Sequence, residues 1–253
     1  MNTPVKAVTF DFWDTIVVDD SDEPKRAKRG LRSKPDERRH LLWQALNNHQ
    51  AISPEHVNAA FDTADAAFNK AWKGHSITWK VADRLLRALM ELNRTLPDDD
   101  LEKLAGDLGR MEVDIPPDPI EGICGALKDL SRRYKLCIVS DALVTPADGL
   151  RRVLDGHGLG QYFQGFAFSD EVGHSKPHAD MFKSAARQLG VEVAEMVHVG
   201  DRDHNDIKGP QALGMKAVLF TASRDADRET TSADAICERH ADLPGIIDKL
   251  ARL

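Results

Sequence analysis

The chain has 253 residues, of which 42% are hydrophobic and 30% charged, and its formal net charge is −7. This composition is typical of an ordered globular protein, and the acidic balance argues against a general nucleic-acid binder. No apolar run approaches the roughly 20 residues that cross a bilayer, and residues 1–11 lack a signal-peptide pattern. The three cysteines are far apart, which suits a reducing compartment. We therefore expect a cytoplasmic protein that binds neither nucleic acid nor membrane.

The first predicted element is a buried strand at residues 5–10, a β-branched and apolar run that leads directly to the carboxylate of Asp11. The next clear strand is residues 135–140, and the segment between the two strands has a helical pattern almost throughout. Apolar residues at a spacing of 3.6 predict four amphipathic helices in that segment. Their apolar stripes lie within residues 41–46, 57–72, 81–92 and 101–111.

A proline-rich run at residues 115–119 ends the helical segment, and helices and strands alternate after it. This alternation is typical of a parallel sheet with helices on both faces. We therefore predict an α/β fold with a doubly wound, Rossmann-like core. The core is assigned residues 1–18 and 117–253, and residues 19–116 are expected to form an inserted helical-bundle cap domain.

Polar side chains follow the strands of the predicted core. In a doubly wound sheet, ligands bind beyond the carboxyl ends of the strands. Those ends carry Asp11, Ser140, Lys176 and the pair Asp201 and Asp206. Carboxylates are the oxygen ligands that Mg²⁺ prefers, and a lysine neutralises an anion as charge shifts in a transition state. The set suits a divalent cation together with a phosphate-like anion.

The sequence around these residues resembles the haloacid dehalogenase (HAD) superfamily along nearly the whole chain. Residues 10–16, 139–141, 175–178 and 199–206 are similar to its four motifs, in order and at the expected strand ends. The helical insertion after the first motif resembles the C1 cap of the superfamily. The resemblance implies a Mg²⁺-dependent hydrolase, most simply a phosphatase that acts on a small anionic phosphorylated metabolite.

The resemblance also implies a role for each site residue. Asp11 is the expected nucleophile, which forms an aspartyl-phosphate that water then hydrolyses. The expected catalytic and substrate-binding partners are Lys176, Thr15, Ser140 and Asp141. The expected Mg²⁺ ligands are the carboxylates of Asp11 and Asp201 and the backbone carbonyl of Trp13. Asp206 is expected to act through a water molecule or by positioning these ligands.

One position departs from the phosphatase pattern of the superfamily. Phosphatases usually carry a second aspartate, the general acid and base, where this chain has Trp13, and Asp14 follows one place later. Asp14 is the candidate catalytic replacement. Phosphonatase-like and dehalogenase-like hydrolysis stay open as alternatives, as does a catalytically weak relative that binds a metabolite or a protein. The retained pair Asp201 and Asp206 favours phosphoryl chemistry.

Two further features are interpreted without a catalytic role. Residues 25–39 are locally basic, and we interpret them as a solvated loop; an electropositive lip that attracts an anionic substrate is the alternative. His174 and His178 have helical spacing, but Pro177 between them disfavours a helix, so we do not expect them to form a ligand pair. The sequence does not indicate an oligomeric state.

Overall fold

The apolar strand patterns form one parallel sheet in the computed structural model, which describes residues 4–252. Its strands follow the order β3-β2-β1-β4-β5-β6. They are β1 (Ala7–Phe10), β2 (Lys135–Ser140), β3 (Gly165–Phe168), β4 (Met196–Gly200), β5 (Lys216–Phe220) and β6 (Ala235–Cys237). The chain adds β2 and β3 on one side of β1 and then crosses to β4 on the other side. The predicted doubly wound α/β fold is confirmed.

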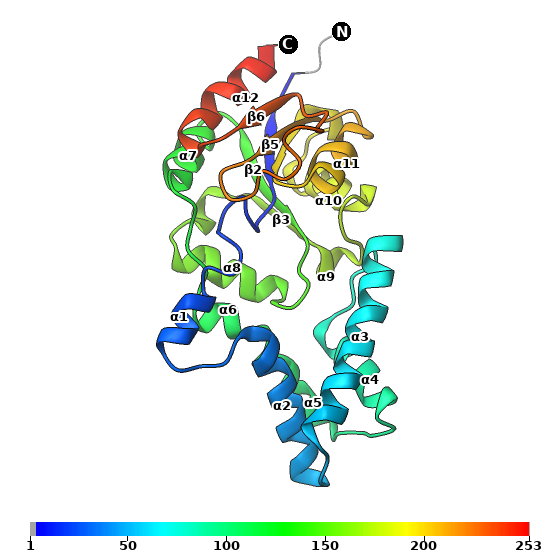
Figure 1. Cartoon of the computed structure of the whole chain (residues 1–253). Coiled ribbons are helices and arrows are strands. Elements are labelled where there is room, and N and C mark those ends of the chain that lie inside the picture. The colour runs from blue at the N-terminus through cyan, green and yellow to red at the C-terminus, as the bar shows by residue number, and fades with distance from the viewer. Residues whose placement is uncertain (1–3, 253) are drawn as a thin grey trace. The chain divides into compact units, whose positions relative to one another are not determined.

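Helices cover both faces of this sheet (Figure 1), with α7 (Ile123–Leu130) and α12 (Leu243–Arg252) on one side, and α10 (Ala179–Leu189) and α11 (Gly209–Gln211) on the other. Phe182 and Ala185 of α10 are fully buried in one apolar cluster with Val139 and Ala167 of the sheet. The remaining elements are short. They are α9 (Ser169–Val172), three 3₁₀ turns η1 (Gly160–Tyr162), η2 (Val193–Glu195) and η4 (His240–Asp242), and a π-helical turn η3 (Asp203–Lys208).

The chain divides into two compact units. The sheet unit comprises the chain up to Asp19, Pro117–Asp141, and the chain from Leu154 onward; the helical unit comprises Asp20–Pro116 and Ala142–Val153. Residues 142–153 were expected in the core, and the structure instead groups them with the helical unit. This segment includes most of α8 (Ala147–Gly156).

Two close contacts hold residues 142–153 to the helical unit. The Arg84 guanidinium donates a hydrogen bond to the Leu143 carbonyl at 3.1 Å, and the Thr145 hydroxyl donates to the Glu112 carboxylate. Gly109 also lies directly against the Pro146 ring, where a Cβ would approach Cδ to 2.9 Å. Sequence pattern does not reveal contacts of this kind, because they join segments far apart in the chain.

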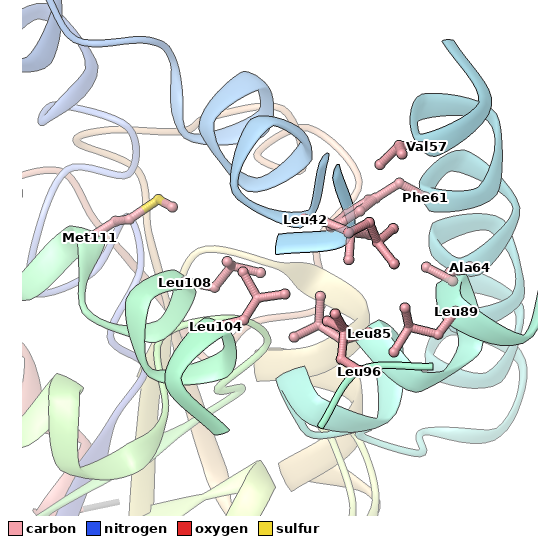
Figure 2. Close-up of a cluster of buried hydrophobic side chains, with 12 residues drawn as sticks. Leu42, Val57, Phe61, Ala64, Leu85, Leu89, Leu96, Leu104, Leu108 and Met111 are labelled. Atoms are coloured by element: carbon pink, nitrogen blue, oxygen red, sulfur yellow. The ribbon is translucent and has the colours of Figure 1, made fainter. Parts of the chain in front are cut away.

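Besides the part of α8 that belongs to it, the helical unit contains the four predicted helices and two short ones. They are α1 (Glu23–Lys28), α2 (Lys34–His49), α3 (Pro54–His75), α4 (Val81–Glu91), α5 (Asp98–Gly109) and α6 (Met111–Asp114). Helix α2 packs against α3 and α5, and α4 packs against the same two helices. Figure 2 shows their apolar side chains, among them Leu42, Phe61, Leu85 and Leu104, converging on one interior. This burial is the main stabilising term of the unit.

The start of α3 illustrates how the sequence sets a helix boundary. The Ser53 hydroxyl accepts a hydrogen bond from the His56 backbone N–H, and Pro54 occupies the first helical position. A serine cap of this kind contributes about 1 kcal/mol. The helix ends at His75, because Ser76, the next residue, takes the left-handed conformation (φ 53°).

The basic segment 25–39 is largely helical rather than a loop, although most of its residues are exposed or half-buried as its charge suggested. Most of it lies in α1 and the beginning of α2, and Lys34 is buried. The Lys34 ammonium lies 2.8 Å from carboxylate oxygens of Asp22 and Glu112 and 3.0 Å from Asp20. These carboxylates compensate the buried charge, and they raise the pKa of Lys34 although burial alone would lower it.

No helix in the described part of the chain has both the length and the apolar character that crossing a membrane requires.

Candidate active site

The carboxyl ends of β1 and β4 bring the expected polar residues together in the sheet unit. Phe10, the last residue of β1, pairs with Val199 of β4 on one side and Ile138 of β2 on the other. Asp11 follows β1 directly, and Asp201 follows β4 directly. Asp11, Asp201 and Asp206 each contribute one carboxylate oxygen to a group of three atoms that lie within 4.8 Å of one another. The three predicted acids therefore form one cluster at the point where the strand order reverses.

Lys176 lies in the middle of these carboxylates. Its buried ammonium is 2.6 Å from Asp11 Oδ1 and 2.7 Å from Asp206 Oδ1. Burial alone would lower the pKa of Lys176, but the carboxylates of Asp11, Asp206 and Asp141 outweigh it and raise that pKa. The Lys176 backbone N–H also donates to Asp141 Oδ1 at 2.9 Å. Lys176 is thus held in place through both its ammonium and its backbone N–H.

Asp206 accepts more hydrogen bonds than any role as a helix cap requires. Its Oδ1 accepts from Lys176 and faces His198 Nε2 at 3.1 Å, and its Oδ2 accepts the Arg202 backbone N–H at 3.0 Å. Burial would raise the pKa of Asp206, but Lys176 and His198 hold it well below its usual range. Gly200 permits the approach, since a Cβ there would lie 2.3 Å from Asp206 Cγ. Asp206 is therefore ionised and fixed in position.

Asp201 has the opposite environment. Both of its carboxylate oxygens are buried and, among the described residues, neither receives a hydrogen bond. The guanidinium Nε atoms of Arg202 and Arg224 are 3.7 and 3.9 Å from its Oδ2, which is beyond hydrogen-bonding distance. Burial and the charges of Asp11 and Asp206 raise the pKa of Asp201 to about 8.

A hard divalent cation fits these donors. Asp201 offers two unpaired oxygens beside Asp11, and an ion between them would supply the charge that keeps Asp201 ionised. Asp206 already has three hydrogen-bond donors, which agrees with a role in positioning the metal ligands rather than in binding the metal directly. The candidate ligand side chains, Asp11 and Asp201, offer the oxygen donors that Mg²⁺ prefers.

The structure places the remaining predicted residues around the cluster. The hydroxyl oxygens of Ser140 and Thr15 are buried and have no hydrogen-bond partner among the described residues, so each is available to an anion. Asp141 is tied to the lysine segment through its side chain. The Trp13 indole N–H donates to the Asp141 backbone carbonyl at 3.3 Å. Trp13 therefore links the first motif to the second and cannot supply a proton-transferring carboxylate.

Asp14 is not brought into the lysine–carboxylate cluster. It takes the left-handed conformation (φ 52°), and its Oδ1 accepts the Asp19 backbone N–H at 3.2 Å. Burial raises the pKa of Asp14, which the Asp19 N–H and the nearby charge of Arg202 partly offset. In the described structure its carboxylate thus bonds to its own loop rather than to Lys176.

Two histidines that the sequence did not single out support the site. His198 of β4 is fully buried, with Nδ1 2.8 Å from the Thr9 hydroxyl and Nε2 facing Asp206. His240 donates from Nε2 to the Thr15 backbone carbonyl at 2.8 Å, and burial lowers the pKa of His240 to about 4. The sequence pattern could have indicated His198, because it is a polar residue inside an apolar strand, two positions before Gly200. His240 had none, because it is 225 positions from Thr15.

Comparison with known proteins was made against this geometry. The family model of haloacid dehalogenase-like hydrolases matches residues 5–214. The chain belongs to the haloacid dehalogenase-like hydrolase family. The resemblance seen in the four motifs is therefore confirmed, and the chain is a member of a family of hydrolases.

Relatives among characterised proteins include phosphatases. The chain is 36% identical over 87 residues to a glyceraldehyde 3-phosphate phosphatase of Methanopyrus kandleri, covering 34% of this chain and 37% of the relative. It is 36% identical over 100 residues to a ribulose-1,5-bisphosphate 5-phosphatase of Halopiger xanaduensis, covering 40% and 41%. The chain thus spans less than half the length of either relative.

Solved structures with the same fold cover nearly the whole chain. A HAD phosphatase from Thermococcus onnurineus has a TM-score of 0.63 at 23% identity, covering 96% of this chain and 98% of that one. A 2-haloacid dehalogenase from Pseudomonas syringae has a TM-score of 0.64 at 19% identity, covering 97% and 99%. YfnB from Bacillus subtilis, solved with bound magnesium, has a TM-score of 0.60 at 17% identity, covering 97% and 99%. At these identities the likeness shows the fold alone.

Proposed function

We propose that this hydrolase is a Mg²⁺-dependent phosphatase that acts on a small phosphorylated metabolite through an aspartyl-phosphate on Asp11. The observation that carries the proposal is Asp201, whose two buried oxygens lack donors among the described residues and lie beside a nucleophile candidate that contacts Lys176. Two of the phosphatase relatives act, by their names, on glyceraldehyde 3-phosphate and on ribulose-1,5-bisphosphate. Compounds of this class are the first substrates to test.

The metal has a defined set of candidate ligands. Asp11 and Asp201 would hold Mg²⁺ through their carboxylates and Trp13 through its backbone carbonyl, with Asp206 ordered behind them by Lys176 and His198. When bound, Mg²⁺ supplies charge that stabilises the phosphoryl oxygens in the transition state. A backbone ligand does not depend on the side chain, so Trp13 is compatible with this role.

The first step is attack by Asp11. Its carboxylate oxygen forms a bond to phosphorus, the bond from phosphorus to the ester oxygen breaks, and the leaving oxygen takes a proton from solvent water. Lys176, 2.6 Å from Asp11, compensates the negative charge that gathers there. The unpaired hydroxyls of Thr15 and Ser140 are donors for the phosphoryl oxygens. In the second step water attacks phosphorus, which releases phosphate and restores Asp11.

Proton transfer is the weak part of this site. Trp13 offers no carboxylate, and Asp14, the next acid in the chain, has a raised pKa and a hydrogen bond from the Asp19 backbone N–H. A positioned general acid or base contributes about 10²–10⁴-fold to rate. We infer that phosphoenzyme hydrolysis is the slower step unless Asp14 turns toward the nucleophile.

Metal dependence is the decisive test of the proposed function. We expect hydrolysis of p-nitrophenyl phosphate and of triose and pentose phosphates to require Mg²⁺ and to stop with EDTA. Asp201→Asn, which removes the charge of a ligand, should raise the Mg²⁺ concentration for half-maximal rate by about 10–100-fold. Asp225→Asn, at an exposed acid outside the site, is the matched control. Absence of turnover across the panel, or turnover unaffected by EDTA, would refute the proposal.

The role of Trp13 has a test of its own. Trp13→Asp should speed phosphoenzyme hydrolysis by at least about tenfold, because it installs a carboxylate where the general acid and base is missing. Single-turnover decay of the trapped aspartyl-phosphate measures this step directly. Trp13→Phe removes the indole bond to Asp141 without adding a carboxylate, and so separates the two effects. A folded, Mg²⁺-binding Trp13→Asp protein with unchanged decay would argue against this explanation.

A further inference from the structure

Three potential metal ligands surround the segment that carries Lys176, outside the carboxylate cluster. His174 and His178 lie on either side of Lys176 in the chain, and Asp180 is in the first turn of α10. The two imidazole rings stack in parallel, with centroids 3.8 Å apart and planes 6° apart. Their helical spacing did not predict a ligand pair, since Pro177 disfavours a continuous helix. In the structure a turn, rather than a helix, brings the rings together.

The ligand atoms converge on one oxygen. Asp180 Oδ2 lies 3.6 Å from His174 Nδ1 and 3.7 Å from His178 Nδ1. In a tetrahedral site with metal–ligand bonds of about 2.0–2.1 Å, neighbouring ligand atoms are about 3.3–3.4 Å apart. The observed distances exceed this separation by a few tenths of an ångström. Binding also requires the two rings to rotate out of their parallel stack, because an ion lies near the plane of each imidazole that binds it.

The two Nδ1 atoms differ in their hydrogen bonding, and His178 Nδ1 must give up a backbone N–H to bind an ion. His174 Nδ1 is buried and has no hydrogen-bond partner among the described residues. His178 Nδ1 receives only the Asp180 backbone N–H, at 3.3 Å. The side chains are 37%, 38% and 46% exposed for His174, His178 and Asp180, so an ion and its remaining water ligands can reach them.

We propose that His174, His178 and Asp180 bind a borderline divalent cation of the Zn²⁺, Ni²⁺ or Co²⁺ type. Two imidazoles and one carboxylate suit these ions, whereas the all-oxygen cluster of Asp11, Asp201 and Asp206 suits Mg²⁺. The chain thus carries two cation sites of different chemistry. This second site does not depend on the proposed phosphatase activity.

The position of the site gives it a consequence for Lys176. Two of the ligands flank this lysine in the chain, and the third belongs to α10. An ion bound there ties the lysine segment to the beginning of the helix and restricts the backbone between residues 174 and 180. Because the ion binds the native chain and not the unfolded one, it should also raise the melting temperature.

Cobalt binding tests the proposal without any measurement of turnover. The wild-type chain is first saturated with Mg²⁺ and then titrated with Co²⁺, following the visible absorption of nitrogen-ligated Co²⁺ and the heat of binding. We expect one Co²⁺ per chain, and about tenfold or weaker binding in each of His174→Ala and His178→Ala. His75→Ala, at an exposed histidine of the helical unit, and Asp201→Asn should bind Co²⁺ as the wild type does.

Three outcomes would overturn the proposal. The first is no saturable Co²⁺ or Zn²⁺ binding by the Mg²⁺-loaded wild type. The second is equal binding by the wild type and both folded histidine variants, which would assign the ion to other side chains. The third is loss of binding in Asp201→Asn but not in His174→Ala, which would assign it to the carboxylate cluster.

Discussion

Asp11→Asn is expected to lower kcat by a factor of about 10⁴–10⁶, the largest effect of any single change in this chain, because it removes the nucleophile of the proposed reaction. The substitution keeps the size of the side chain and one oxygen that can face a cation. It also removes one of three buried carboxylates, so the variant should fold. The measurement is steady-state hydrolysis of p-nitrophenyl phosphate in Mg²⁺, together with trapping of the phosphoenzyme.

The trapping experiment makes the Asp11 prediction specific. The wild type should accumulate a covalent phosphate that hydroxylamine releases, and Asp11→Asn should accumulate none. Asp225→Asn again serves as the control at an exposed carboxylate. Turnover by Asp11→Asn within tenfold of the wild type, in protein free of other phosphatases, would mean that Asp11 is not the nucleophile.

Most of the fold was predictable because its strands are short apolar runs with polar residues directly after them. The strand that ends before Asp11 and the strand that ends before Asp201 are of this kind, and their parallel pairing follows from the helices between them. Residues 142–153, by contrast, were assigned to the core, whereas the structure groups them with the helical unit. Their place depends on contacts with Arg84, Gly109 and Glu112, which no local pattern encodes.

The site was predictable where a motif names a residue, and unpredictable where a partner comes from elsewhere in the chain. Asp11, Asp201, Asp206 and Lys176 follow from the motifs, and the structure brings them together. Their charge states do not follow from the motifs. Asp201 and Asp206 are five positions apart, yet their pKa values move in opposite directions, because donors surround one and not the other. That asymmetry became visible only with the hydrogen-bond partners.

Lys176→Met is expected to destabilise the chain and to remove activity together, because one ammonium serves both purposes. The substitution leaves Asp11 and Asp206 without their shared cation in a buried site. Removing one partner of a buried ion pair costs about 3–5 kcal/mol in the free energy of unfolding. Urea unfolding without Mg²⁺ measures this loss, with Lys183→Met as the control at an exposed lysine of α10.

Two further measurements separate charge compensation from loss of packing in Lys176→Met. Mg²⁺ should restore part of the lost stability, since it brings positive charge to the same carboxylates. Adding Asp206→Asn should also restore part of it, so that the double variant loses less than the two single changes combined. A loss below about 1 kcal/mol, or strict additivity with Asp206→Asn, would contradict the prediction. Neither rescue restores turnover, because the nucleophile still lacks the neighbouring ammonium that compensates the charge of the transition state.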